Sequence, residues 1–322
     1  MDVVAPAGGA AGAAMREDVR RGLSQPQKEL DPKYFYDERG SDLFEQITRL
    51  PEYYPTRAER TLLEATMPDL IDEIRPRSLV ELGAGSAIKT RVILNAMMET
   101  GAGVQYVPVD VSAEFLAETA RRLRTEYPAL RIDPAIGDFS SDLHLPSIER
   151  RALFAFLGST IGNFDERDAV AILSRISSQM RADDAFILGV DLRKDHDVIE
   201  AAYNDSAGVT GEFNLNVLRV LNRELGADFD LSEFSHRAFY DRRLHRIEMH
   251  LVAKSPQTVR IPEIGDIDIG AGESIRTELS YKYDRDAVAS LFEKSGLCLE
   301  QWLSGDDEAF AIVLGSRRWN RA

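Results

Sequence analysis

Two glycines and an acidic residue lie close together in the stretch Ser78-Leu-Val-Glu-Leu-Gly-Ala-Gly-Ser-Ala-Ile-Lys-Thr-Arg91. An apolar run ends at Glu81, glycines follow at positions 83 and 85, and a polar segment that can open a helix comes next. Because glycine lacks a Cβ atom and tolerates positive φ, Gly83 and Gly85 let a ligand approach the backbone. The first N–H groups of the following helix can face that ligand. The pattern predicts a strand, a ligand-binding turn and a helix.

The spacing of this turn restricts the ligand. A dinucleotide-binding loop has a third glycine three residues after the second, where this chain has Ile88. A phosphate-binding loop has glycine directly before its lysine, and here Ile88 precedes Lys89-Thr90. The remaining Glu-x-Gly-x-Gly form at a strand end is typical of loops that hold S-adenosylmethionine (SAM). Taken alone, the stretch is equally consistent with a tight turn in another α/β protein.

Carboxylates follow two further predicted strands. Asp110 ends the apolar run 104–109, where an acid in nucleoside-binding α/β domains accepts hydrogen bonds from ribose hydroxyls. It could equally cap the helix that begins near Ser112, and the two roles are compatible. Asp138 and Phe139 follow the next predicted strand, where a carboxylate and an aromatic ring could hold an adenine by hydrogen bonding and stacking.

Two other stretches carry polar candidates. The segment Gly158-Ser-Thr-Ile-Gly-Asn-Phe164 follows an apolar strand and leaves the sheet on the side where ligands bind in such folds. In Leu50-Pro-Glu-Tyr-Tyr-Pro-Thr-Arg57, two prolines bracket Tyr53 and Tyr54, which predicts a rigid turn. The phenol groups could form a lid or a pocket wall, and ordinary aromatic packing is the alternative.

These candidates require an α/β framework to position them. Apolar runs predict strands that alternate with helices, and the ranges are 78–82, 104–109, 131–136, 152–157 and 185–190 for strands and 58–74, 92–97 and 169–180 for helices. A helix over 284–294 precedes strands 297–303 and 309–314, whose short connection makes them an antiparallel hairpin. The prediction is a Rossmann-like, seven-stranded sheet with one reversed strand, which is the class I methyltransferase arrangement.

The segment 194–282 interrupts this framework. It is mostly helical over 196–223 and alternates apolar and polar residues from 234 onwards, which indicates strands with one solvated face. We therefore predict a methyltransferase domain of residues 58–193 plus 283–322. Residues 15–57 plus 194–282 would form a second, smaller α+β domain that covers the cofactor and contacts the substrate. The Ala- and Gly-rich residues 1–14 are expected to be a disordered tail.

Composition excludes several classes of function. The chain has 322 residues, 44% hydrophobic and 29% charged, as expected for a globular protein. The net charge of −15 argues against binding to nucleic acids or anionic membranes, and no apolar run approaches the ~20 residues that span a bilayer. The single cysteine, Cys298, indicates a cytoplasmic setting. The five histidines lack metal-type spacing, so we expect no metal. We also expect a monomer.

Several motifs together resemble one family, the L-histidine Nα-methyltransferases of ergothioneine biosynthesis. They are Leu50-Pro-Glu-Tyr-Tyr-Pro-Thr-Arg57, Glu81-Leu-Gly-Ala-Gly85, Phe156-Leu-Gly-Ser-Thr-Ile-Gly-Asn163, Tyr203-Asn-Asp-Ser-Ala-Gly-Val-Thr210 and Asn222-Arg-Glu-Leu225. The likeness extends from about Asp18 to the C-terminus. The resemblance implies that the protein uses three SAM molecules to convert histidine to its Nα-trimethyl betaine, hercynine.

The resemblance also implies roles for matching residues. Tyr53 would line the histidine pocket, Asn163 and Tyr203 would bind the α-amino and α-carboxylate groups, and Tyr36 would lie near the amine. Glu278 and Ser280, on one strand face, would hold the imidazole, with Met249 lining the same pocket. Tyr36 and Asn163 are the expected catalytic residues. The expected cofactor-binding residues are Glu81, Gly83, Gly85, Lys89, Asp110, Asp138 and Phe139.

The chemistry of these residues agrees with a histidine substrate. A carboxylate and a hydroxyl suit an imidazole, whereas tryptophan has one ring donor and would leave Glu278 poorly paired. Methyl transfer is an in-line displacement that needs an unprotonated amine about 3 Å from the methyl carbon. Tyr36 or a water could accept the proton. The alternatives are an N-methyltransferase of the same fold that acts on another amino acid such as tryptophan, and a SAM-binding protein without catalytic activity.

Overall fold

The chain folds into two compact units. A computed structural model describes residues 10–101, 103–111, 113–137 and 144–318. Unit 1 comprises residues 1–54 and 195–280, and unit 2 comprises residues 55–194 and 281–322. Each unit is therefore built from segments that are far apart in the sequence. Of the helices described, none combines the length and apolar character that a membrane span requires.

Unit 2 contains a mostly parallel sheet. Its order is β12-β13-β6-β5-β1-β2-β3, and β4 also pairs with β2. The strands are β1 (Ser78–Leu82), β2 (Gln105–Asp110), β3 (Arg131–Ile132), β4 (Ala135–Ile136), β5 (Ala152–Phe156), β6 (Ala185–Asp191), β12 (Leu297–Ser304) and β13 (Phe310–Arg317). Strand β13 is antiparallel to both β6 and β12. The structure thus confirms the predicted α/β class, the terminal hairpin and the reversed strand.

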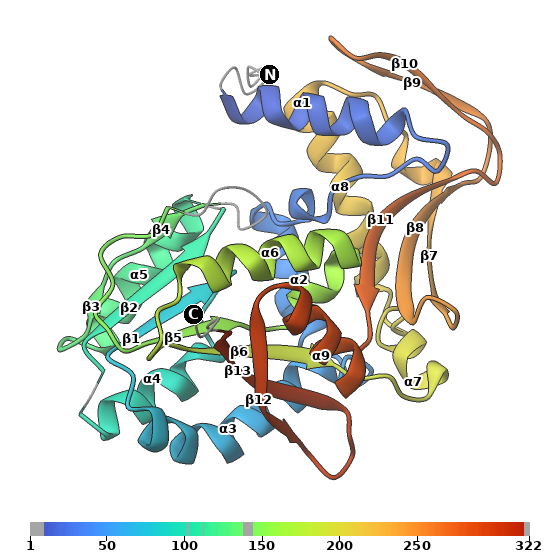
Figure 1. Cartoon of the computed structure of the whole chain (residues 1–322). Coiled ribbons are helices and arrows are strands. Elements are labelled where there is room, and N and C mark those ends of the chain that lie inside the picture. The colour runs from blue at the N-terminus through green and yellow to red at the C-terminus, as the bar shows by residue number, and fades with distance from the viewer. Residues whose placement is uncertain (1–9, 102, 112, 138–143, 319–322) are drawn as a thin grey trace. The chain divides into compact units, whose positions relative to one another are not determined.

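Helices cover both faces of this sheet (Figure 1). Apolar residues of α6 (Glu166–Gln179) and α9 (Arg285–Lys294) are buried against one face. Apolar residues of α3 (Pro55–Ile74), α4 (Thr90–Glu99) and α5 (Ala113–Glu126) are buried against the other face. Strands β1 and β5 are buried along their whole length. Their continuous apolar character follows from this double coverage.

Two predicted boundaries in unit 2 were wrong. The strand predicted over 131–136 is two short strands, β3 and β4, separated by Asp133 and Pro134. Proline has no N–H to donate to the ladder, so it interrupts the pairing with β2. Helix α3 begins at Pro55, three residues before the predicted start, because proline is well tolerated in the first turn of a helix.

Unit 1 is an α+β assembly. Its helices are α1 (Ala10–Leu23), η1 (Pro32–Phe35), α2 (Glu38–Ile47), α7 (His196–Ala201), α8 (Val209–Leu225) and η3 (Leu231–Glu233). Strands β7 (Phe234–Asp241), β8 (Arg246–Ala253) and β11 (Ser274–Tyr281) form one sheet, and β9 (Gln257–Ile261) and β10 (Gly265–Ile269) form another. Helix α8 places Phe213, Val217 and Leu221 in the core of this unit.

One further expectation needs correction in unit 1. Residues 10–14, which we expected to belong to a disordered tail, are the first residues of α1. Alanine is the strongest helix former, so the alanine-rich sequence extends the helix. Outside the strands, His245 occupies the turn before β8 with a φ of 53°.

Candidate functional site

Three loops meet at one edge of the sheet in unit 2. Leu82, the last residue of β1, pairs with Val109 of β2 on one side and with Phe156 of β5 on the other. These strands are parallel, so the segments that follow them leave the sheet side by side at its carboxyl edge. The predicted residues Gly83, Gly85, Asp110 and Asn163 therefore come from adjacent loops.

The turn after β1 has room for a ligand. Gly83 and Gly85 have φ values of 67° and 50°, which other residues seldom adopt. A Cβ atom built at Gly85 would meet no other atom within 4 Å, so the space beside it is open. The N–H of Gly83 donates to Val109 O at 2.9 Å, which binds the turn to the neighbouring strand. This open, glycine-lined backbone fits a bulky ligand such as SAM.

Asp110 contacts the same turn. Its Oδ2 atom accepts a hydrogen bond from the Gly85 N–H at 3.1 Å, and its carbonyl oxygen accepts one from Gly137 N at 3.1 Å. The carboxylate, which is partly exposed, thus lies at the glycine turn where a ribose would need an acceptor. Its proximity to Gly85 supports the ribose-binding interpretation.

Three apolar side chains at this edge are unusually exposed. Ile88, Val111 and Ile136 are 47%, 48% and 67% exposed. Ile88 follows the glycine turn, Val111 follows Asp110, and Ile136 pairs with Asp110 across the β2–β4 ladder. Of the three, only Ile88 stood out in the sequence, where its place after the glycines excluded other cofactors, and Val111 and Ile136 carried no signal there. Exposed apolar surface beside a ribose acceptor suits the flat face of an adenine.

Glu81 lies beneath the turn. It is 4% exposed, and its carboxylate accepts hydrogen bonds from Thr90 Oγ1 and from the Tyr106 hydroxyl. Burial raises the pKa of Glu81 to about 7, although these two hydrogen bonds act in the opposite direction. The group ties β1 to β2 and to the first turn of α4. We therefore interpret Glu81 as a support for the cofactor loop.

Lys89 forms an ion pair with Glu59, which was not among the predicted site residues. Glu59 lies on α3, and its side chain is fully buried. The other carboxylate oxygen of Glu59 accepts the Gly158 N–H at 2.6 Å, at the start of the loop after β5. Glu59 thus joins the first residues of α4 to the loop that carries Asn163. Its place in a helical pattern gave no signal of this role.

The loop after β5 is closely packed within unit 2. It runs through Gly158 and the short helix η2 (Thr160–Asn163). A Cβ atom at Gly162 would lie 2.8 Å from Tyr281 O, so no larger residue fits there. Ser159 Oγ accepts the Asp191 N–H at 3.0 Å and connects the loop to the end of β6. These contacts fix the backbone that leads to Asn163. Asp138 and Phe139 lie outside the described residues.

In unit 1, aromatic rings bring three predicted residues together. Tyr36 contacts Phe44 edge-on at 5.6 Å between ring centroids, Phe44 contacts Tyr53 at 6.3 Å, and Tyr53 contacts Tyr203 at 6.3 Å. Phe213 of α8 packs against Tyr36 and Phe44 at 5.6 and 5.9 Å. Phe44 and Phe213 were not among the predicted site residues. Their helical spacing looked like ordinary core, and they are the packing that joins the tyrosines.

The aromatic group continues to β11 through a buried hydrogen bond. The Tyr203 hydroxyl donates to Ser280 Oγ at 2.8 Å, and the two residues are 7% and 3% exposed. Glu278 lies on the same strand and is partly exposed. Met249, on the adjacent strand β8, is 1% exposed, and its carbonyl oxygen lies 3.1 Å from Thr277 Oγ1. Unit 1 therefore contains every predicted substrate-binding residue except Asn163.

Tyr36 is exposed but rigidly flanked. The residue is 43% exposed. It follows the buried Phe35 and precedes the partly exposed Asp37. Asp37 caps α2 by accepting the Gly40 N–H at 2.8 Å, and Asn216 donates to both Asp37 and the Phe35 carbonyl oxygen at 2.7 and 3.1 Å. The backbone on both sides of Tyr36 is therefore held while its ring remains accessible.

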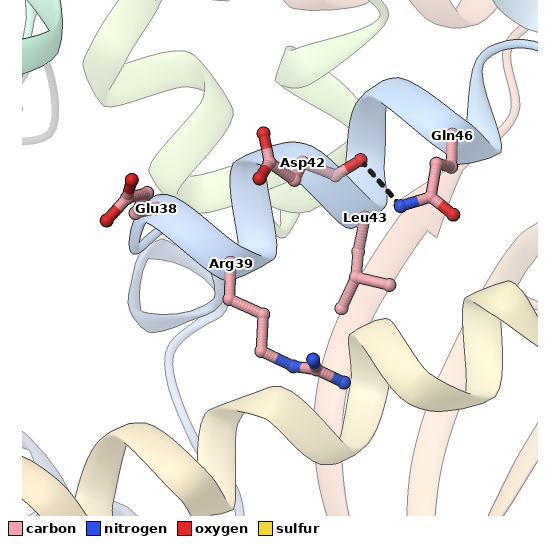
Figure 2. A pocket seen from close by; sticks show the side chains of 5 residues that line it. All are labelled: Glu38, Arg39, Asp42, Leu43 and Gln46. Carbon is pink, nitrogen blue, oxygen red and sulfur yellow. Dashed lines mark hydrogen bonds between the residues drawn. The ribbon is translucent and has the colours of Figure 1, made fainter.

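A separate hollow of about 300 Å³ lies along α2. Figure 2 shows its lining residues, Glu38, Arg39, Asp42, Leu43 and Gln46. None of them is a predicted site residue. One group of potential metal ligands, Asp195, His196 and Asp197, occurs among the residues described, and both aspartates are exposed. The hollow and this group lie outside the candidate site.

The sheet order, the reversed β13, the glycine turn after β1 and the acid after β2 together define the SAM-dependent methyltransferase fold. Residues 15–317 match the sequence model of a family described as histidine-specific methyltransferase, SAM-dependent. The chain belongs to this histidine-specific, SAM-dependent methyltransferase family.

Named relatives agree with the family match. The chain is 43% identical over 307 residues to a histidine N-alpha-methyltransferase of Mycobacterium tuberculosis, covering 94% of this chain and 95% of that protein. It is 42% identical over 309 residues to a histidine N-alpha-methyltransferase of Mycolicibacterium smegmatis, covering 95% and 96%. It is also 28% identical over 255 residues to ergothioneine biosynthesis protein 1 of Schizosaccharomyces pombe, covering 76% and 33%.

Proposed function

We propose that this protein is a SAM-dependent L-histidine Nα-methyltransferase that converts histidine to hercynine in ergothioneine biosynthesis. The observation that carries the proposal is the match to a histidine-specific family over residues 15–317. The geometry of the chain adds to it. Unit 2 has an open glycine turn with an adjacent carboxylate, and unit 1 has a group of tyrosines joined to Ser280.

In this proposal unit 2 is the methyltransferase domain and holds the cofactor. Gly83 and Gly85 let SAM lie against the backbone, and Asp110 accepts hydrogen bonds from the ribose hydroxyls. Val111 and Ile136 supply apolar surface for the adenine. When bound, SAM supplies an electrophilic methyl group on a sulfonium. Lys89, oriented by Glu59, would hold the negative carboxylate of the methionine portion.

Unit 1 is the substrate-binding domain in this proposal. Glu278 and Ser280 hold the two imidazole nitrogens, with Ser280 oriented by the hydroxyl of Tyr203. Met249 and Tyr53 line the ring pocket. Asn163 and Tyr203 are assigned to the α-amino and α-carboxylate groups. These groups orient the amine lone pair, which is the main catalytic task when the electrophile is already activated.

Tyr36 is assigned to the amine because its hydroxyl belongs to an exposed ring on a rigid segment. In each transfer the amine nitrogen forms a bond to the methyl carbon while the carbon–sulfur bond breaks, and the nitrogen keeps a positive charge until a proton leaves. A water that Tyr36 orients accepts that proton after the first and second transfers, or Tyr36 relays it by releasing its own hydroxyl proton to solvent as it takes the proton from the nitrogen. The third transfer leaves a quaternary nitrogen that has no proton to lose.

A competition assay tests the proposed substrate. Purified protein is given labelled SAM with histidine and tryptophan at equal concentration. We expect labelled histidine to exceed labelled tryptophan by at least about 100-fold, because tryptophan would leave the Glu278 carboxylate poorly paired. A preference for tryptophan would contradict the histidine assignment. Tight SAM binding with no methyl transfer to either amino acid would instead indicate a SAM-binding protein without catalytic activity.

We further propose that the enzyme acts as a monomer in the cytoplasm. The single cysteine and the net charge of −15 support this setting. Light scattering at the concentration used for the activity assay gives the oligomeric state, and a stable dimer would contradict the proposal.

A further inference from the structure

A chain of hydrogen bonds starts and ends at Tyr203 within unit 1, and the backbone of β11 completes it between Thr277 and Ser280. We call it the Tyr203 circuit, and its members are Tyr203, His236, Asn214, Thr277 and Ser280. His236 Nε2 contacts Tyr203 O at 2.9 Å, and His236 Nδ1 contacts the Asn214 amide nitrogen at 2.8 Å. Thr277 of β11 donates to Asn214 Oδ1 at 2.6 Å. The Tyr203 hydroxyl donates to Oγ of Ser280, also on β11, at 2.8 Å. The circuit joins β7, α8, β11 and the turn after α7.

The partners determine the direction of each bond. The amide nitrogen of Asn214 also donates to His250 O at 3.1 Å, and its Oδ1 accepts from Thr277, so the amide can have only one orientation. His236 Nδ1 must therefore accept a hydrogen bond. Its Nε2 then carries the proton and donates to Tyr203 O. Burial lowers the pKa of His236, which agrees with a neutral ring.

Most of the Tyr203 circuit is buried, so the loss of one of its hydrogen bonds has a high energetic cost. Asn214 is fully buried and Thr277 is 1% exposed, so an unpaired polar atom in either would be costly. Tyr203 lies in a turn, where regular secondary structure does not fix its carbonyl group. Asn204 also binds this turn to β7, donating to Ala238 O at 3.1 Å. The turn therefore stays attached without His236, but the hydrogen bond between His236 and the carbonyl of Tyr203 is lost.

We propose that His236, supported by Asn214, is a positioning residue that sets Tyr203 relative to Glu278 and Ser280 on β11. This inference rests on the proposed function, which assigns those residues to histidine. His236 touches neither substrate nor cofactor in this account. It acts by holding the carbonyl of Tyr203, so that the hydroxyl at the other end of the residue meets Ser280 where the imidazole binds.

Two substitutions each keep one of the two hydrogen bonds of the His236 ring and remove the other. In His236→Gln, the amide nitrogen takes the place of Nε2 and can still donate to Tyr203 O. In His236→Asn, the shorter amide takes the place of Nδ1, which keeps an acceptor for Asn214 and removes the donor to Tyr203. His245→Asn is the matched control, because His245 is partly exposed in a turn and has a positive φ that asparagine tolerates.

Steady-state kinetics on the full chain test the inference. We expect His236→Asn to raise the KM for histidine about tenfold, with kcat and the KM for SAM within about twofold of the wild type. The kinetic constants of His236→Gln and His245→Asn should both remain within about twofold of the wild type, although His236→Gln removes the acceptor for the buried Asn214 amide and should be less stable. Equal behaviour of His236→Asn and His236→Gln would overturn the inference, as would an equal loss of affinity for histidine and SAM.

A second readout does not depend on activity. Nitrogen NMR of the labelled wild type should show His236 as a neutral ring with its proton on Nε2. A proton on Nδ1, or a charged ring at neutral pH, would overturn the circuit. A wild type that methylates no histidine overturns the proposed function and the inference that rests on it. An active wild type with identical His236 variants overturns the inference alone.

Discussion

At the scale of single residues, the two carboxylates Glu81 and Glu278 have different environments and different expected roles. Glu81 is buried with Thr90 and Tyr106 beneath the glycine turn of unit 2. Glu278 is partly exposed on β11 of unit 1, two residues before the buried Ser280. The first supports a loop, and we propose that the second recognises a substrate ring. Each role predicts a different effect of substitution.

Substitution of Glu278 should affect one ligand only. We expect Glu278→Ala to weaken histidine binding about 10- to 100-fold, the effect of removing a charged hydrogen-bond partner, and to leave SAM binding unchanged. Calorimetric titration with each ligand measures this. Glu300→Ala provides a control, because Glu300 lies on β12 and binds Ser316. Equal weakening of both ligands by Glu278→Ala would show that the pocket has been misassigned.

Glu81 should make stability depend on pH. Its pKa is about 7 in the folded protein against 4.5 ordinarily, so the folded state binds the proton more tightly. This stabilisation is complete below about pH 4.5 and is lost as pH rises through 7. The free energy of unfolding of the wild type should be about 1 kcal/mol lower at pH 8 than at pH 6 because of Glu81. Glu81→Gln cannot titrate at this position, so it should not show this loss. Urea unfolding at both pH values measures this. Parallel losses in the two proteins would contradict it.

At the scale of elements, α3 connects the two loops that flank the proposed cofactor site. Glu59 pairs with Lys89 at the start of α4 and accepts the N–H of Gly158 after β5. We expect Glu59→Gln to keep the second contact, lose the ion pair and raise the KM for SAM about tenfold. Glu64→Gln on the same helix removes an exposed pair with Arg60 and should change nothing. Indistinguishable kinetics for the two variants would exclude this role of α3.

The elements also show what the sequence could and could not predict. Strands β1, β5 and β6 followed from apolar runs, because burial on both faces leaves a strong signal. Strand β3 was predicted too long because the effect of Pro134 depends on its place in the ladder. Glu59, Phe44 and Phe213 have ordinary helical patterns. Their roles come from contacts with residues distant in the sequence, which one chain without relatives does not reveal.

At the scale of the whole molecule, the chain passes between its units after residues 54, 194 and 280. The two ends of the segment 195–280 are held close together in unit 2, since the Arg193 N–H donates to Tyr283 O at 2.9 Å and Leu192 bridges Tyr283. Such paired ends are typical of a domain inserted into another. Unit 2 could therefore fold without unit 1.

A shortened protein tests that independence. It begins at residue 55 and joins residue 194 to residue 281 through a short Gly-Ser linker. We expect it to fold, to bind SAM and to be inactive towards histidine. Thermal unfolding with and without SAM measures the first two properties, because a ligand stabilises only the state that binds it. A protein that fails to fold, or that transfers methyl groups to histidine, would contradict the proposed division of labour.

The central claim is that the chain methylates the α-nitrogen of histidine. Mass spectrometry of histidine after prolonged incubation with the full-length protein and excess SAM tests it directly, because fragmentation gives both the number and the position of methyl groups. The account predicts complete conversion to a product with three methyl groups on the α-nitrogen. Unchanged histidine, or methyl groups on the imidazole ring, would contradict it.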